Sequence, residues 1–196
     1  MNPQLTPLPP LLFVRHGATA LNAAGLRCGG DVDLPLIDLG HRQAAAVSRE
    51  LVQRRARVDV IVTSSLQRTR QTAEIIARHL RCLDLVIEPG FDERRLGDWN
   101  RRPIAETQAE LAAGVTPPDG ESNAEFTRRV REAALVTLLP RLPRHVLLVG
   151  SKGVARILGE LAGAAPRCPV GNAEIVEFDL AALASSVSRR ALECVA

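Results

Sequence analysis

The sequence lacks the features that would direct a chain of 196 residues to a membrane, to an oxidising compartment or to a metal. No apolar run is long enough to cross a bilayer. The four cysteines are widely separated (Cys28, Cys82, Cys168, Cys194), without a C-x-x-C pair or a cysteine–histidine cluster, which disfavours a zinc site and a disulfide scaffold. Residues 1–10 are proline-rich and carry no positive charge, so they predict an extended lead-in and not a signal peptide. We expect a soluble, cytoplasmic protein.

Lysine is almost absent as well. Of the 25 basic residues, 24 are arginine, and Lys152 is the single lysine. The net charge of +3 demands neither a nucleic-acid partner nor a membrane partner. The length and the hydrophobic content of 46% suit one domain, 1–196, with a sizeable core. The oligomeric state is left open, with a homodimer as one option.

Short apolar runs alternate with longer amphipathic stretches, which predicts an α/β fold with a mostly parallel central sheet. The predicted strands are 11–14, 58–64, 84–89, 145–150 and 174–180. The predicted helices are 39–55, capped by Asp38, then 66–80, one entered at 121–122 and ending near 139, and 151–161. The strand 84–89 is the weakest, and we place it near a sheet edge because Pro89 closes it. Residues 100–122 combine a helical piece with a turn-rich run and predict a flap over a site.

Polar residues follow three of the predicted strands. These segments are Arg15-His16-Gly17, Ser64-Ser65 and Gly150-Ser151-Lys152. Ligands of open α/β sheets bind in the crevice at the carboxyl ends of the strands. The three segments are therefore predicted to face one crevice.

The triplet Arg15-His16-Gly17 offers the first groups that phosphoryl transfer requires. A neutral imidazole can attack phosphorus, the planar fork of an arginine binds two oxygens at once, and glycine permits close approach. The triplet alone is weak evidence, because about one chain in thirty of this composition contains it by chance. A strand-end histidine bonded to backbone is the alternative interpretation.

Two later segments add the other groups. In TSSLQRTRQTAE (63–74), Arg68 lies one turn into a helix that starts at a strand end, so that a guanidinium and a helix N-terminus face the same anion. A solvated arginine on a charged helix face is the alternative. In FDERRLGDW (91–99), we expect Leu96 and Trp99 to shield the carboxyl group of Glu93 partly, which would raise its pKa and suit a general acid.

In order, the segments LLFVRHGATALN, DLGHRQA, VIVTSSLQRTRQTAE, DERRLGDW and DGESNAEFTRRV resemble the histidine phosphatase superfamily, also called phosphoglycerate mutase-like. The resemblance extends from about Leu11 to Leu161. It implies a three-layer αβα sandwich and a phosphatase that hydrolyses a small phosphorylated metabolite through a phosphohistidine, without metal or organic cofactor. By resemblance, the catalytic residues are the nucleophile His16, the phosphoryl-binding Arg15 and Arg68, and the proton donor Glu93. Gly17, Thr19 and Asn22 would line the same pocket.

The chain departs from the family pattern at VGSKGVAR (149–156). Ser151 stands where the family carries a second histidine, and Lys152 stands where it carries a glycine. A serine offers one neutral hydrogen bond, whereas an ammonium group at a helix start can restore a positive charge near a bound phosphate. We interpret Ser151 and Lys152 as a functional replacement that binds substrate. The alternative is that Lys152 points into solvent and the site has decayed.

Three functions follow from this departure. The first is a phosphatase. The second is a non-catalytic phosphate-ligand binding protein on the same scaffold, and the third is a phosphoglycerate mutase-like phosphotransferase with an altered pocket. Family mutases tend to have longer insertions between the third and fourth motifs, which disfavours the third. The sequence leaves the substrate itself undetermined.

Overall fold

The structure is a computed structural model that describes residues 8–163 and 170–193, with the side chains from 188 onward left aside. Residues 1–7 of the predicted lead-in, Cys168 and Cys194 lie outside the described residues. Cys28 and Cys82 are free thiols.

The centre of the protein is a five-stranded sheet of order β3-β2-β4-β1-β5. Its strands are β1 (Leu11–Arg15), β2 (Val60–Thr63), β3 (Leu85–Ile87), β4 (Val146–Gly150) and β5 (Ile175–Phe178). All neighbouring pairs are parallel except β1 and β5, which are antiparallel. Every residue of β2 and β4 is buried, because helices cover both faces of these strands. The predicted mostly parallel sheet is confirmed, and β3 lies at an edge as expected.

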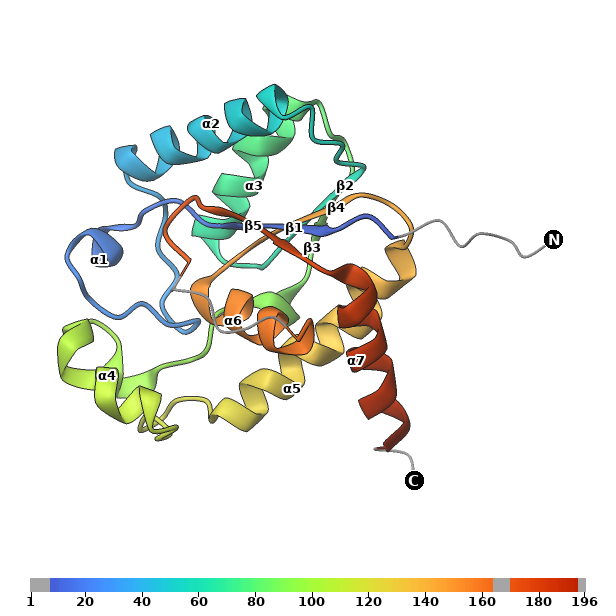
Figure 1. Cartoon of the computed structure of the whole chain (residues 1–196). Coiled ribbons are helices and arrows are strands. Elements are labelled where there is room, and N and C mark those ends of the chain that lie inside the picture. Colours follow the sequence, from blue (N-terminus) through green and yellow to red (C-terminus); the bar gives the residue numbers. More distant parts are fainter. Residues whose placement is uncertain (1–7, 164–169, 194–196) are drawn as a thin grey trace.

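Helices form a layer on each face of the sheet (Figure 1). One layer contains α2 (Asp38–Gln53) and α3 (Gln67–Leu80), and the other contains α5 (Asn123–Ala133), α6 (Lys152–Leu161) and α7 (Leu180–Glu193). Val47 of α2 and Ile76 of α3 pack in one apolar core, while Phe126 of α5 and Ile157 of α6 pack in the other. The expected three-layer αβα sandwich is therefore confirmed.

Some element ends differ from prediction for local reasons. The N-cap of α2 is Ile37, and Asp38 is instead the first helical residue, where its carboxylate favours the positive helix terminus. The α5 helix ends at Ala133 and continues as a π-turn (Ala134–Leu138) and a 3-10 turn (Leu139–Arg141), because Pro140 cannot extend an α-helix. The α7 helix was not predicted.

Short elements lie where β1 ends (Figure 1). They are α1 (Ala20–Ala23), α4 (Ile104–Ala112), and the 3-10 turns Pro89–Phe91 and Gly97–Trp99. The sheet register places Arg15 opposite Gly150 and Thr63 opposite Val149. The carboxyl ends of β1, β4 and β2 are therefore level, and the segments that follow them meet at one edge of the sheet.

The chain leaving β1 packs directly on the first turn of α2. A Cβ atom at Gly17 would fall on the carbonyl oxygen of Gly40, and one at Gly40 would fall on the carbonyl oxygen of Ala18. In contrast, a Cβ at Gly159 in α6 would meet only Phe178, at an ordinary 3.5 Å.

Gly40 lies in α2 and Gly159 in α6. Substituting each of them by alanine should therefore have opposite effects on the free energy of unfolding. We expect Gly40→Ala to lower the free energy of unfolding by about 1–3 kcal/mol, because backbone must move to admit the methyl group. Gly159→Ala should raise the free energy of unfolding by up to about 1 kcal/mol, through the better helix propensity of alanine. Urea denaturation of both variants tests this, and equal effects of the same sign would contradict it.

Candidate active site

His16 follows the last residue of β1 and is almost fully buried, at 4% exposure. Its Nδ1 lies 2.7 Å from the carbonyl oxygen of Gly17. Since a carbonyl only accepts, Nδ1 carries the proton and Nε2 keeps a free lone pair. The backbone N–H of Gly17 donates to Thr72 Oγ1 at 3.1 Å, which fixes the turn that carries the histidine.

The surroundings of His16 keep its imidazole neutral. Burial lowers the pKa of His16 well below its ordinary value, and the nearby charges of Arg68 and then Arg15 lower it further. A neutral imidazole with a free Nε2 is the form that attacks an electrophile.

The two guanidinium groups beside His16 are partly satisfied by backbone carbonyls. Arg15 Nη1 donates to Val170 O at 2.7 Å. Arg68, which is 1% exposed, donates from Nη1 to Val32 O at 2.8 Å and from Nη2 to Gly29 O at 3.2 Å. Burial lowers the pKa of Arg15, and the charge of Glu93 partly opposes this.

Three buried polar atoms at this edge of the sheet have no hydrogen-bond partner among the described residues: Arg15 Nε, Arg68 Nε and Ser151 Oγ. Ser151 is the N-cap of α6 and is 1% exposed, yet its hydroxyl makes no capping bond. An unpaired buried polar group is costly. Their position after three adjacent strands favours an anionic ligand with several oxygens.

Lys152 is the first residue of α6, and its charge lies near the same cluster. Its pKa is lowered by desolvation first and then by the positive charges of Arg15 and Arg27, while Glu93 opposes the shift. Lys152 itself is an exposed residue. That it brings a positive charge to this pocket stays a prediction.

Thr19 and Asn22 belong to the short α1 helix next to the nucleophile. They form a capping box in which the Asn22 amide N–H donates to Thr19 Oγ1 and Asn22 Oδ1 accepts from the Thr19 N–H. Sequence reasoning missed Asn172, whose Nδ2 donates to His16 O at 3.0 Å and approaches Asn22 Oδ1 at 3.4 Å. No periodicity or motif singled out Asn172, because it lies in a turn before β5.

Glu93 is fixed between its own loop and α6. Its Oε1 accepts from the Arg94 N–H at 2.8 Å, and its Oε2 accepts from the Gly153 N–H at 2.9 Å. A Cβ at position 153 would fall on Glu93 Oε1, so a side chain there would displace the Glu93 carboxyl group. Leu96 and Trp99, which follow Glu93 in the same segment, are buried. That they shield its carboxyl group stays a prediction.

The Glu93 loop depends on a second, buried ion pair. Glu121 is 2% exposed, and its carboxylate accepts two bonds from Arg129, at 3.0 Å and 2.7 Å. Arg129 Nη1 also donates to the carbonyl oxygens of Gly90 and Asp92, at 3.1 Å and 2.9 Å. One arginine of α5 thus ties the start of the Glu93 loop to the end of the flap.

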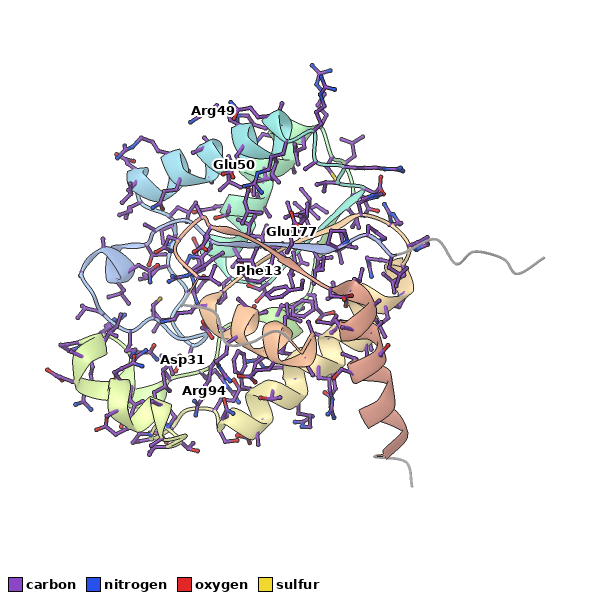
Figure 2. All side chains as sticks on the ribbon, viewed as in Figure 1. Phe13, Asp31, Arg49, Glu50, Arg94 and Glu177 are labelled. Carbon is purple, nitrogen blue, oxygen red and sulfur yellow. The ribbon has the colours of Figure 1, made fainter. Side chains whose placement is uncertain are left out.

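The loop 93–97 also contacts the segment after α1. Asp31 accepts from the N–H groups of Leu96 at 3.1 Å and Gly97 at 2.8 Å, and Figure 2 shows Asp31 and Arg94 close together on the side of α4. The flap, the Glu93 loop and the segment after α1 therefore form one connected wall.

A second hollow lies at the opposite end of the sheet, where β1 and β4 begin. A cavity of about 210 Å³ there is lined by residues that include Leu12, Arg57 and His145. Asp59 accepts from Arg57 Nε and from His145 Nδ1, each at 3.0 Å, and hydrogen bonds from His145 lower the pKa of Asp59. Three of the charged or titratable groups that line this cavity are already paired: Arg54 with Glu50, and Arg57 and His145 with Asp59.

Within residues 8–163 and 170–193, no cluster of His, Cys, Asp or Glu has the arrangement of a metal site. In the same part of the chain, no helix combines the length and apolarity that a membrane span requires.

The fold and the histidine–arginine cluster define a phosphoryl-transfer class of protein. The model of the "Histidine phosphatase superfamily (branch 1)" matches residues 11–193, so the chain belongs to this superfamily. It is 39% identical over 184 residues to "Probable phosphoglycerate mutase GpmB" of Proteus mirabilis, covering 85% of this chain and 83% of that protein.

Solved structures agree with this assignment. A mycobacterial glucosyl-3-phosphoglycerate phosphatase in complex with VO3 matches with a TM-score of 0.70 and 29% identity, over 86% of this chain and 90% of that chain. The α-ribazole phosphatase from Shigella flexneri matches with a TM-score of 0.69 over 87% of this chain and 96% of that chain, and its 24% identity shows the fold alone.

The lowered pKa of His16 predicts a pH-dependent stability. The unfolded chain binds a proton at this imidazole below about pH 6.5, whereas the folded chain does so only at much lower pH. The stability contributed by neutral His16 is therefore complete above about pH 6.5 and is lost as the pH falls, by up to about 1.4 kcal/mol per pH unit. Urea denaturation at pH 7.5 and pH 5.5 should show a steeper loss for the wild type than for His16→Gln. Parallel losses would contradict this.

Two adjacent arginines of α5 test the support of the Glu93 loop. Arg129→Met should lower the free energy of unfolding by about 3 kcal/mol, because it leaves the buried Glu121 carboxylate unpaired. Arg128→Met is the matched control: its ion pair with Glu132 is exposed, so we expect a change below about 0.5 kcal/mol. Chemical denaturation measures the free energy of unfolding of both variants. Similar losses in the two would show that the buried Glu121–Arg129 pair stabilises the fold no more than the exposed pair does.

Proposed function

We propose that this chain is a phosphoric monoester hydrolase that cleaves a small phosphorylated metabolite through a phosphohistidine on His16. The observation that carries the proposal is the neutral, buried imidazole of His16 beside the guanidinium groups of Arg15 and Arg68. Membership of the superfamily and the phosphatases among its structural neighbours support the same reaction class. We expect it to act in the cytoplasm.

In the first step, Nε2 of His16 attacks the phosphorus atom, and the bond between phosphorus and the ester oxygen breaks. Glu93 donates a proton to the leaving alkoxide. Arg15 and Arg68 bind the equatorial oxygens, and their unpaired Nε groups are available for this. Binding the dianion also offsets the repulsion between the two cations.

In the second step, a water molecule attacks the phosphorus of the phosphohistidine while the bond between phosphorus and Nε2 breaks. Glu93, now a carboxylate, accepts the proton of that water. Inorganic phosphate leaves, and His16 and Glu93 return to their starting forms. Water thus supplies the atoms that balance the reaction, and the proposal requires no metal or organic cofactor.

Ser151 and Lys152 take the place of the family's second histidine in this proposal. The Ser151 hydroxyl donates to a phosphoryl oxygen, which satisfies a buried group that has no partner among the described residues. Lys152 supplies the positive charge that serine lacks. Gly17, Thr19 and Asn22 shape the adjacent wall of the substrate pocket.

Release of phosphate from a panel of phosphate monoesters tests this function between pH 5 and pH 8. We expect turnover by the wild type and a loss of at least about 1,000-fold in His16→Ala, because the nucleophile itself is removed. Rapid acid-free quenching with radiolabelled substrate should trap label on His16.

The absence of phosphate release from every ester, with folded protein, would contradict the proposal. Binding of phosphate without turnover would instead favour the non-catalytic binding protein. Transfer of the phosphoryl group to a second hydroxyl, and not to water, would favour the phosphotransferase.

A further inference from the structure

Asn172 joins the backbone of the proposed nucleophile to the α1 helix, and neither the family resemblance nor the reaction above gives it a role. It lies half-buried in the turn before β5. Its Nδ2 donates to the carbonyl oxygen of His16 at 3.0 Å and to Asn22 Oδ1 at 3.4 Å. A backbone carbonyl only accepts, so the nitrogen of the Asn172 amide must face these two oxygens. The two hydrogens of one amide therefore link the residue that attacks to α1.

The turn before β5 is held against the end of β1 by backbone hydrogen bonds. The N–H of Ala173 donates to Arg15 O at 3.0 Å and lies 3.3 Å from His16 O, and the Arg15 N–H donates to Glu174 O at 3.3 Å. Ala173 has a φ of +55°, in the left-handed region that favours glycine. A residue keeps such a backbone conformation only where its surroundings hold it, and such residues cluster at functional sites. The position of the neighbouring Asn172 amide relative to His16 is therefore fixed.

The amide of Asn22 has a defined orientation as a result. Its Oδ1 accepts from the Thr19 N–H at 3.3 Å, from Thr19 Oγ1 at 3.1 Å and from Asn172 Nδ2. A backbone N–H only donates, so the oxygen of the Asn22 amide faces this cluster of donors and the nitrogen points away from it. In the part of the chain that the structure describes, Asn22 Nδ2 has no hydrogen-bond partner. Asn22 thus presents a free N–H donor group beside the turn of His16.

Asn172 is also the link that ties α1 to the rest of the protein. The helix has four residues and buries none of them. Among residues 8–163 and 170–193, no other hydrogen bond joins α1 to a residue outside 19–26. Without the Asn172 amide, Asn22 Oδ1 would keep bonds only within its own helix turn, and the direction of its nitrogen relative to His16 would no longer be fixed.

We propose that Asn172 is a positioning residue that acts through Asn22, by aiming the Asn22 amide nitrogen at an oxygen of the phosphoryl group that His16 attacks. The inference rests on the proposed function, because that phosphoryl group belongs to its substrate. A neutral donor binds an oxygen without adding a further positive charge beside Arg15 and Arg68. A donor whose direction is already set needs no reorganisation when the phosphoryl group binds.

A double-mutant cycle tests whether Asn172 acts through Asn22. With the ester that the wild type hydrolyses fastest, we expect kcat/KM to fall by about tenfold in Asn22→Ala and by nearly as much in Asn172→Ala, as for one oriented hydrogen bond. The double variant should stay within about threefold of Asn22→Ala, because Asn172 then has no amide left to orient. Losses that multiply in the double variant would overturn the inference.

Two further variants separate the donor from the shape of the turn. Asn172→Asp keeps the shape but only accepts, so it should lose at least as much activity as Asn172→Ala; wild-type activity would contradict a donor role. Glu174→Ala is the matched control, since it removes the acceptor of the Gly171 N–H in the same turn and leaves the Asn172 amide in place. Its effect should multiply with that of Asn22→Ala. A cycle of Glu174→Ala that is as non-additive as that of Asn172→Ala would show a general loosening of the turn and refute the specific role. If Asn172→Ala does not fold, the cycle is run with Asn172→Asp.

Titration calorimetry with inorganic phosphate distinguishes failure of this inference from failure of the proposed function. If no ester is hydrolysed but phosphate binds, the same cycle in Kd decides: about tenfold weaker binding in each single variant, with little further loss in the double, supports the positioning role. Turnover with multiplying losses would refute the positioning role and leave the function standing. Folded wild type that neither turns over an ester nor binds phosphate would overturn both.

Discussion

The placement of two positive charges, one buried and one half-buried, beside a buried neutral imidazole is the constraint from which the rest of the site follows. Arg15 and Arg68 are held close to His16, and a proton on the histidine would add a third charge in a place that water hardly reaches. Carbonyl oxygens of Val170, Val32 and Gly29 satisfy part of each guanidinium. The remaining donors suit an anion, so in the proposed reaction the electrostatics that keep His16 neutral also favour the binding of its phosphorylated target.

In the proposed reaction, this constraint also bears on Ser151, which stands where the family resemblance implies a second histidine. Lys152 would supply the positive charge there, and its backbone neighbour Gly153 donates to Glu93. Three consecutive residues at the start of α6 therefore contribute to the proposed site: the unpartnered Ser151 hydroxyl, Lys152, and the Gly153 N–H that binds the proposed acid Glu93. The Glu121–Arg129 ion pair and the close packing of Gly30 on Glu93 O fix the Glu93 loop against the start of α6.

Most of the fold was predictable because its signals are local. Runs such as VDVIVTS and HVLLVG are buried on both faces, and such strands are continuous in apolar residues. The glycine and proline positions marked the ends of β3 and β4. The α7 helix was missed although Asp179 caps it, with Oδ1 accepting from the N–H groups of Ala181 and Ala182, because Asp179 was assigned to the strand 174–180. The π-turn at 134–138 was missed because it follows the α5 helix without a break in pattern.

The sequence by itself determined the class of chemistry, because His16, Arg15, Arg68 and Glu93 stand in an ordered set of motifs that tolerates few alternatives. Tertiary structure decided which other residues join them. Asn172 carries no motif, and it acquires its place only from contacts across the chain, to the His16 carbonyl and to Asn22. The parallel register of β1 and β4 likewise brings residues 15 and 150 together, although 135 positions separate them along the chain.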